Sequence, residues 1–498
     1  MNVALSFSLD HKCPLLRCCG GLGGKKMREK WRVYQKEVKK VSFLAAPIII
    51  VFVLQYLLQV VTIIIVGHLG DELLLSGISI ASSFVRVTGF ALLLGMAGAL
   101  ETLCGQAYGA QQYQKIGVYT YSCMICLLLA CFPISIVWFF TDKLLISIGQ
   151  DPSISSIARK YSLFLIPNLF AHAILQSLMR YLLTQSLILP LLFCSLATLS
   201  FHIPICWLLV FHFNLKVVGA ALALGMSYWL NVILLGLYIV FSPSCNKTQA
   251  TFSMEAISSI GKFFRLAIPS AVMVCFEWWS YEIILLLSGL LPNPKVEASV
   301  LSICFSVTYL HYFIPYGLGA TASTRVSNEL GAGNPEAAKV AVKVVGVLGI
   351  IESVTVSAAL FGCHNMLGYA FTSDTQIANH IASFWPLICL SILIDSFLGI
   401  LSGVARGCGW QRVGAYVNLG SYYIVGIPMA AVLAFVVHLR VKGLWIGLVS
   451  GATLQSFLFA LITTFTNWHK QALKARERVL EENTRQNLCP TSDSSIQL

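Results

Sequence analysis

The sequence predicts an all-α polytopic membrane protein with twelve transmembrane helices in two similar six-helix lobes. Three observations predict it: an apolar composition, a series of long apolar stretches, and an internal repeat. Of the 498 residues, 57% are hydrophobic and only 11% are charged, and the mean hydropathy is +0.79. Soluble domains carry about 25% charged residues. The lipid bilayer is therefore the main environment of this chain.

The apolar stretches have the length that a membrane helix needs, about 18 residues or more. They begin near Val41, Leu73, Ile116, Ile154, Ile188, Val217, Phe263, Val296, Val340, Ile377, Val413 and Gly443. The second, fourth and tenth are interrupted by glycine, serine or charge, so they are the least regular of the twelve.

The positive charges predict an orientation. An even number of spans places both termini on one side of the membrane. Residues 1–40 contain ten Lys or Arg, and the tail 467–498 contains five. Cytoplasmic segments carry an excess of these residues, so both termini are expected in the cytoplasm. A nucleic-acid-binding arm is disfavoured because few aromatic residues are interleaved with the charges.

A repeat relates the two halves at a constant offset of 222 residues. Leu44–Pro47 matches Leu266–Pro269, and the register continues through pairs such as Gly95 with Gly317. Six helices separate equivalent positions, so the halves run in the same direction across the membrane. Parallel repeats of this kind place a binding site between the halves and open it alternately to each side.

These patterns predict five regions in chain order. They are a basic cytoplasmic arm (1–40), an N-terminal lobe (41–241), a cytoplasmic linker (242–261), a C-terminal lobe (262–466) and a cytoplasmic tail (467–498). The tail from Trp468 to Arg485 is expected to form an amphipathic helix lying on a surface.

Enzyme signatures are missing from the sequence. It contains no Walker P-loop, no His-Glu-x-x-His and no Gly-x-Ser-x-Gly. Most of the 16 cysteines lie inside apolar stretches without metal-ligand spacing. We therefore expect no catalytic residues, no metal site and no cofactor, and any uphill transport must draw on an ion gradient.

Two carboxylates inside apolar stretches are the strongest functional candidates. Glu277 lies about two turns past Pro269 in the seventh span, and Asp395 lies in the tenth. An ionised group at such depth costs several kcal/mol unless it faces water or a partner. Each acid is expected to exchange a proton, and as neighbours in one cavity they would titrate as a pair. The alternative is a structural role for each.

Other polar and aromatic residues are candidates for a cavity that takes a flat apolar or cationic molecule. They are Gln55, Tyr56, Met273, Trp278 and Tyr281. At the repeat offset Glu277 corresponds to Gln55 and Asp395 to Ala173, so proton coupling is expected only in the C-terminal lobe.

The remaining intramembrane charges have less defined roles. Glu101 is expected near the membrane surface and Glu352 early in the ninth span, both with structural functions. Glu282 is turned away from Glu277, and Arg86 is the one positive residue inside the second span that belongs to no loop. His172 and His202 are expected to pack or to hydrogen-bond.

Four long segments resemble the multidrug and toxic compound extrusion (MATE) family, specifically its plant DETOXIFICATION branch. They are Thr102–Ala110, Leu287–Pro294, Arg325–Pro335 and Gly403–Gln411, and the resemblance extends over about residues 40–468. It implies a MATE-like fold of twelve helices around a central cleft. It also implies antiport of organic cations, alkaloids, flavonoids or xenobiotics against protons, with Glu277 and Asp395 as the proton-linked acids. Many bacterial relatives carry an acid in the first helix, whereas this chain has Gln55 and Tyr56 there.

The expected function is thus proton-coupled export of small organic compounds by a monomer in the lipid bilayer of the plasma membrane or the vacuole. A flippase for lipids or lipid-linked precursors is the alternative, disfavoured because the spans offer little positive charge beyond Arg86. A passive channel or scaffold is a third possibility, and it would be indifferent to the two acids.

Overall fold

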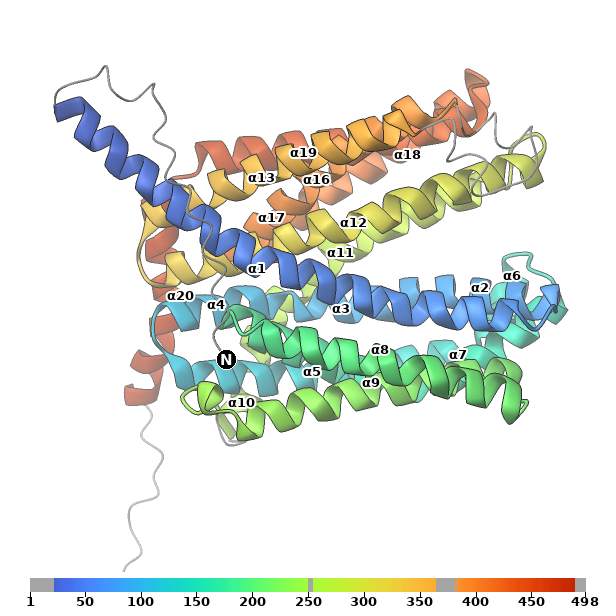
Figure 1. The fold of residues 1–498 in the computed structure, drawn as a ribbon, viewed down its shortest axis with the longest axis horizontal. Coiled ribbons are helices and arrows are strands. Elements are labelled where there is room, and N and C mark those ends of the chain that lie inside the picture. Colours follow the sequence, from blue (N-terminus) through green and yellow to red (C-terminus); the bar gives the residue numbers. More distant parts are fainter. Residues whose placement is uncertain (1–21, 250–253, 364–380, 382, 489–498) are drawn as a thin grey trace, which may run out of the picture.

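The protein is a bundle of helices in a computed structural model that describes residues 22–249, 254–363, 381 and 383–488 (Figure 1). The first half contains α1 (Leu22–Gly67), α2 (Glu72–Val85), η2 (Arg86–Phe90), α3 (Ala91–Ala97), α4 (Ala99–Gly109), α5 (Tyr113–Phe139), α6 (Thr141–Ser147), α7 (Pro152–Thr184), α8 (Leu189–Trp207), η3 (Leu208–His212) and α9 (Lys216–Phe241). Two short elements follow, η4 (Pro243–Cys245) and α10 (Met254–Ser258). The second half contains α11 (Ile260–Ser288), α12 (Pro294–Gly331), α13 (Pro335–Gly362), α16 (Trp385–Cys408), α17 (Gln411–Asn418), η5 (Leu419–Gly426), α18 (Ile427–Ala431), η6 (Val432–Val436), α19 (Arg440–Phe465) and α20 (Trp468–Leu488).

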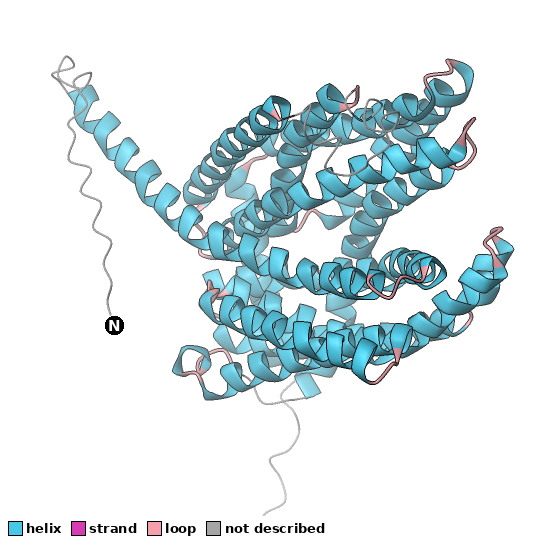
Figure 2. Cartoon of the chain, turned by 45° about the vertical axis from the view of Figure 1, so that its right-hand side comes forward, coloured by secondary structure: helices cyan, strands magenta, loops and turns pink. Residues whose placement is uncertain are grey.

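Twelve of the described helical segments are long and apolar enough to cross a membrane, which confirms the predicted fold class. Figure 2 shows that the described chain is helical, with only loops between the helices. The second span runs from Glu72 to Gly109 through α2, η2, α3 and α4. Glycines and a π-helical turn interrupt it, which explains its irregular pattern in the sequence.

Two spans begin at places that differ from the expected ones. α1 begins at Leu22, so the described part of the basic arm is helical and continuous with the first span. The tenth span was expected from Ile377, which lies outside the described residues; α16 begins at Trp385. Pro386 occupies the first turn of α16, where a missing backbone N–H costs nothing.

The two halves lie on opposite sides of the bundle, with α1 and α11 between them (Figure 1). α1 packs on α8 in its own half and on α12 and α13 in the other, and α11 likewise contacts α3 and α17. Each of these two helices carries the proline that the repeat aligns, Pro47 and Pro269. α1 and α11, the first helices of the two repeats, therefore each contact both halves.

At one end of the bundle, where α20 lies, the halves touch; we call this the terminal end (Figure 1). α4 and α12 pack closely there at three glycines. A Cβ at Gly105 would collide with Ser327, one at Gly109 with the Asn328 carbonyl, and one at Gly331 with the Gln106 carbonyl. Only glycine lets α4 and α12 approach so closely.

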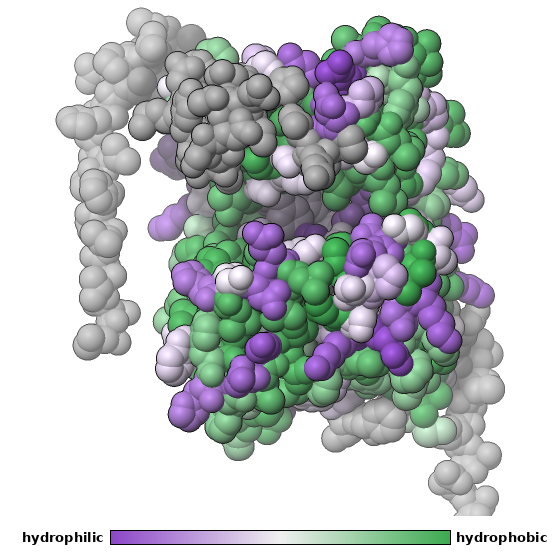
Figure 3. Space-filling model, turned by 90° about the vertical axis from the view of Figure 1, so that its right-hand side faces the viewer, coloured by the Kyte–Doolittle hydropathy of each residue, from purple (hydrophilic) through white to green (hydrophobic). Residues whose placement is uncertain are grey.

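The opposite end is open. Figure 3 views the bundle from that end and shows a hollow between the two halves, with hydrophilic residues on its rim. Since the halves meet at the terminal end and separate at the other, the structure is a conformation open on one side.

Candidate functional site

A buried ion cluster holds the halves together at the terminal end. Arg406 Nε of α16 lies 2.9 Å from Glu101 Oε2 of α4, and both side chains are less than a tenth exposed. Arg180 of α7 approaches the other carboxylate oxygen, with Nε 3.9 Å from Oε1. Glu101 is buried between the halves, where this ion pair gives it a structural role. Breaking a buried pair by removing one partner is strongly destabilising, so this cluster favours the closed terminal end.

Neighbouring hydrogen bonds cross the same interface. The Thr102 hydroxyl donates to the Arg406 carbonyl at 2.5 Å, and the Gln106 amide donates to the Gly407 carbonyl at 3.1 Å. Gln411 in turn donates to the Thr102 hydroxyl at 2.6 Å. These residues belong to two of the segments that carry the family resemblance, so those segments form the contact between the halves.

α20 covers this contact from outside. The Arg478 guanidinium donates to Gln106 Oε1 of the first half at 3.0 Å and to the Cys408 carbonyl of the second at 3.2 Å. Gln471 donates to the same carbonyl at 2.6 Å. Burial lowers the pKa of Arg478 below its usual value. The predicted tail helix is present, but it packs on the protein, because its apolar face is buried against α12 and α13.

Two lysines fix the α20 backbone to both halves. Lys115 of α5 donates to the Val479 carbonyl at 2.6 Å, and Lys262 of α11 donates to the Arg478 carbonyl at 3.1 Å. α20 is therefore hydrogen-bonded to each half.

Glu277 lies in a narrow cavity between the halves. The cavity is about 20 Å³, and Glu101, Arg180, Glu277 and Arg406 all line it. That volume holds about one water molecule, far less than an organic molecule needs. Glu277 thus belongs to the same pocket as the ion cluster, with two carboxylates facing two guanidinium groups.

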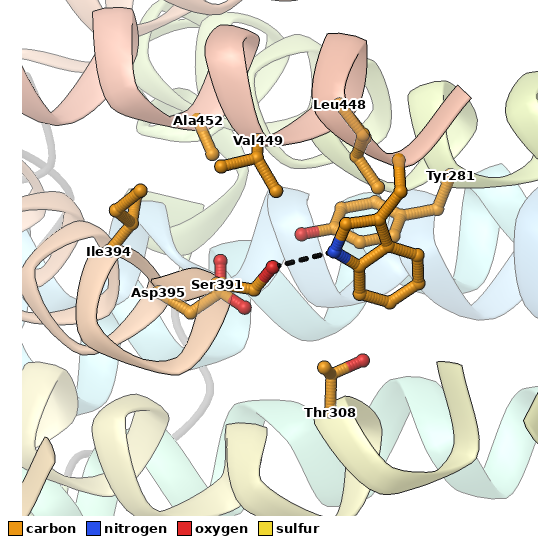
Figure 4. Close-up of a pocket in the computed structure, with 9 residues that line it drawn as sticks. Tyr281, Thr308, Ser391, Ile394, Asp395, Leu448, Val449 and Ala452 are labelled. Atoms are coloured by element: carbon orange, nitrogen blue, oxygen red, sulfur yellow. Dashed lines mark hydrogen bonds between the residues drawn. The ribbon is translucent and has the colours of Figure 1, made fainter. Parts of the chain in front are cut away.

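Asp395 lies in a separate cavity inside the second half. Figure 4 shows its carboxylate and the Tyr281 hydroxyl pointing into this pocket, beside Ser391 and Thr308. The Ser391 hydroxyl accepts a hydrogen bond of 2.8 Å from the Trp445 indole, which fixes that wall. The two acids therefore do not share one cavity, although they interact electrostatically, and Tyr281 interacts with both.

The other cavity residues named from the sequence do not gather in one cavity. Met273 and Trp278 line the Glu277 pocket, and Tyr281 lines the Asp395 pocket. Tyr56 packs against Tyr309, with ring centroids 5.3 Å apart. Gln55 Nε2 is buried, and none of the described residues hydrogen-bonds to it.

A further intramembrane acid forms a pair in the second half. Glu352 Oε1 lies 2.8 Å from His311 Nε2, and the Ser396 hydroxyl donates to Glu352 Oε2 at 2.9 Å. Ser396 follows Asp395 directly in α16, so this pair lies next to the Asp395 helix turn. Both histidines are placed as expected: His202 hydrogen-bonds Thr62 and Ser227, and the His172 ring packs on Phe90 and Tyr228 at centroid distances of 4.7 and 5.7 Å.

Sequence reasoning missed the residues that close the terminal end. Arg406, Arg180 and Arg478 received no role, although arginines in or beside apolar stretches are rare enough to have drawn attention. Within the described residues, no group of three or more His, Cys, Asp or Glu side chains is placed to hold a metal ion.

Two parallel helical halves, a cleft open at one end and acids buried between and within the halves define a membrane transporter. The chain belongs to the MatE family, whose model matches residues 47–208 and 269–432. The two matches begin 222 residues apart, which is the offset of the repeat.

The relatives agree with the predicted resemblance and confirm it. Protein DETOXIFICATION 8 of Arabidopsis thaliana is 53% identical over 444 residues, covering 89% of this chain and 91% of that protein. Protein DETOXIFICATION 14 of the same organism is 53% identical over 447 residues, covering 90% and 92%.

Solved structures have the same fold. The crystal structure of the eukaryotic MATE transporter AtDTX14 is 52% identical, with a TM-score of 0.87, and covers 90% of this chain and 100% of that one. A multidrug resistance MATE family transporter in an outward-facing conformation shares the fold at 17% identity, with a TM-score of 0.77 and coverage of 89% and 97%.

Proposed function

We propose that this protein is a proton-coupled antiporter that exports small organic compounds from the cytoplasm by alternating access. Organic cations, alkaloids, flavonoids and other xenobiotics are the proposed substrates, and Glu277 and Asp395 are the proposed proton carriers. A proton gradient drives the cycle, and no cofactor is required.

The observation that carries this proposal is the pocket shared by Glu277 and the ion cluster. With Glu277 ionised, the negative charges of two carboxylates and the positive charges of two guanidinium groups cancel in one buried cavity. Protonation of Glu277 leaves Glu101 alone against Arg180 and Arg406. An uncompensated buried charge is costly, so protonation weakens the closed terminal end and favours its opening.

Asp395 supplies the second proton site. Its pocket lies in the same half as Glu277, and Tyr281, which lines that pocket, interacts electrostatically with both acids. Protonation from the acidic side removes negative charge from the cavity. A cationic substrate is then bound less tightly and leaves. Loss of the protons on the other side restores the charge, and substrate and proton therefore compete.

The proposal includes an orientation of the protein in the membrane. The terminal end, with Lys39, Lys40, Lys115, Lys262 and Arg478, faces the cytoplasm, in keeping with the positive charge of cytoplasmic segments. The open cleft then faces the outside of the cell or the vacuole, and both compartments supply protons. The transporter functions as a monomer, because one chain contains both halves of the cleft.

Flippase activity toward a lipid-linked precursor is less well supported. A diphosphate headgroup needs several positive charges, whereas Arg180 and Arg406 are both committed to Glu101.

The test is uptake of a fluorescent organic cation into proteoliposomes with an imposed pH gradient. Wild-type protein is expected to accumulate the dye, and Glu277→Gln and Asp395→Asn are expected to abolish gradient-driven accumulation. Glu336→Gln is the matched control, since its carboxylate is 69% exposed on α13. Gradient-independent uptake by the wild type, or full accumulation by both variants, would reject the antiporter.

A further inference from the structure

A large apolar groove lies between α3 and α5 of the first half and α11 of the second. Its volume is about 400 Å³, against about 20 Å³ for the cavity of Glu277. Binding sites for drug-sized molecules measure about 300–1,000 Å³, so this groove is large enough for a ligand. Every residue that lines it is aliphatic, aromatic or sulfur-containing. The groove therefore suits an apolar chain and offers no partner for a polar group inside it.

The groove opens toward the lipid. Leu129 of α5 is 53% exposed, and Ile268 and Trp279 of α11 are 56% and 39% exposed. All three lie in segments that are long and apolar enough to cross a membrane. Exposed apolar surface at this depth contacts lipid tails, which are as apolar as leucine. Lipid is therefore the surrounding medium from which a ligand of this groove comes.

The length of the groove matches one leaflet of a bilayer. On α11 it extends from Phe264 to Trp279, which is about 22 Å of helix. A bilayer with its headgroup regions is about 40–45 Å thick, so one leaflet is about half of that. At the terminal end, Lys262 donates to the Tyr119 hydroxyl of α5 at 3.3 Å, and at the other end the Trp279 indole donates to the Val87 carbonyl at 3.1 Å. These contacts connect α11 to the first half at both ends of the groove.

Arg265 supplies a positive charge at the terminal end of the groove. It follows Phe264 and precedes Ile268 by three residues, so it lies on the side of α11 that lines the groove. Its side chain is exposed, and among the described residues none of the ion pairs includes it. α11 begins at Ile260, about 8 Å away along the helix, which places Arg265 at the depth of the lipid headgroups. Basic residues at this depth on the cytoplasmic side bind anionic headgroups.

We propose that this groove binds one anionic phospholipid, with an acyl chain lying along α11 and the phosphate on Arg265. Because α3 and α5 belong to the first half and α11 to the second, the chain contacts both halves. The groove shares no lining residue with the Glu277 cavity, so the lipid occupies a site of its own. In the proposed orientation the lipid belongs to the cytoplasmic leaflet, where anionic lipids are found.

The experiment compares two phospholipids with identical acyl chains, the anionic phosphatidylglycerol and the zwitterionic phosphatidylcholine. Native mass spectrometry of the delipidated full chain in detergent gives the dissociation constant of the first molecule bound. The wild type is expected to bind phosphatidylglycerol about fivefold more tightly, the usual contribution of one arginine facing an anionic lipid. Arg265→Gln is expected to remove this preference and to leave phosphatidylcholine affinity within about twofold.

Two further variants test the position of the site. Arg412→Gln removes another exposed arginine, in the first turn of α17, which does not line the groove, and should keep the preference. Ala130→Trp places a large side chain in the groove from α5. Each methylene kept out of an apolar site costs about fourfold in affinity, so both lipids should bind about tenfold more weakly or worse. A circular dichroism spectrum like that of the wild type confirms that Ala130→Trp is folded.

Equal affinity of the wild type for the two lipids, or an unchanged preference in Arg265→Gln, would overturn the site. Unchanged affinities in a folded Ala130→Trp would also overturn it. The same holds if Arg412→Gln loses the preference, because the preference would then reflect the positive charge of the whole protein. The measurement needs neither a pH gradient nor a transported compound, so its result is independent of the antiporter test.

Discussion

Glu101→Gln should open the terminal end. The change removes the carboxylate that pairs with Arg406 and Arg180, whose nitrogens lie 2.9 and 3.9 Å from it. Breaking a buried pair costs about 3–5 kcal/mol, and each 1.4 kcal/mol is tenfold in a population. The ratio of closed to open terminal ends should therefore fall by about 10²- to 4 × 10³-fold.

Double electron–electron resonance measures this shift. Spin labels are attached to cysteines at Gln114 and Asn334, which are exposed at the terminal end in the first and second halves. Accessible native cysteines are first replaced. The wild type should give one short distance, and Glu101→Gln should add a longer one. Glu277→Gln imitates protonation of its pocket and should shift the distances the same way, but less.

Removing the opposing charge is the internal check. Glu101→Gln combined with Arg406→Gln leaves fewer unpaired cations, so the double variant should be closed more often than Glu101→Gln alone. Identical distance distributions in the wild type and Glu101→Gln would refute the reasoning, because the ion cluster would then have no part in holding the halves together.

Three further outcomes are expected. Arg478→Gln removes two hydrogen bonds between α20 and the halves, and should lower the free energy of unfolding by about 1–3 kcal/mol in detergent. Gly331→Val brings a side chain against the α4 backbone, so the spin labels should stay at the longer distance even with a full ion cluster. Glu352→Gln weakens the buried pair with His311 and should lower the free energy of unfolding by about 1–3 kcal/mol, whereas the exposed Glu336→Gln should leave it unchanged.

The architecture could be predicted from the sequence because hydropathy and the internal repeat are both visible in the order of the residues. Each apolar stretch must form its own hydrogen bonds in lipid, so a long one is a helix. The offset between Pro47 and Pro269 predicted from the sequence that the two halves are parallel repeats. Helix ends were less accessible: α1 continues through the basic residues down to Leu22, since Lys and Arg are good helix formers.

The site was only partly accessible. Glu277 and Asp395 stood out as acids in apolar surroundings, but the sequence did not show that they occupy two cavities. Glu101 and Arg406 are 305 residues apart, and only the close packing of α4 on α16 brings them together. A local pattern cannot report a contact of that separation.

The place of α20 in the chain has a consequence for biosynthesis. α20 follows all twelve membrane segments, so it is the last described helix to leave the ribosome. Both halves are synthesised before Arg478 and the carbonyls that Lys115 and Lys262 bind exist. The newly made bundle therefore assembles before α20 can bind to its terminal end. The hydrogen bonds between α20 and the two halves form only after α20 has been translated.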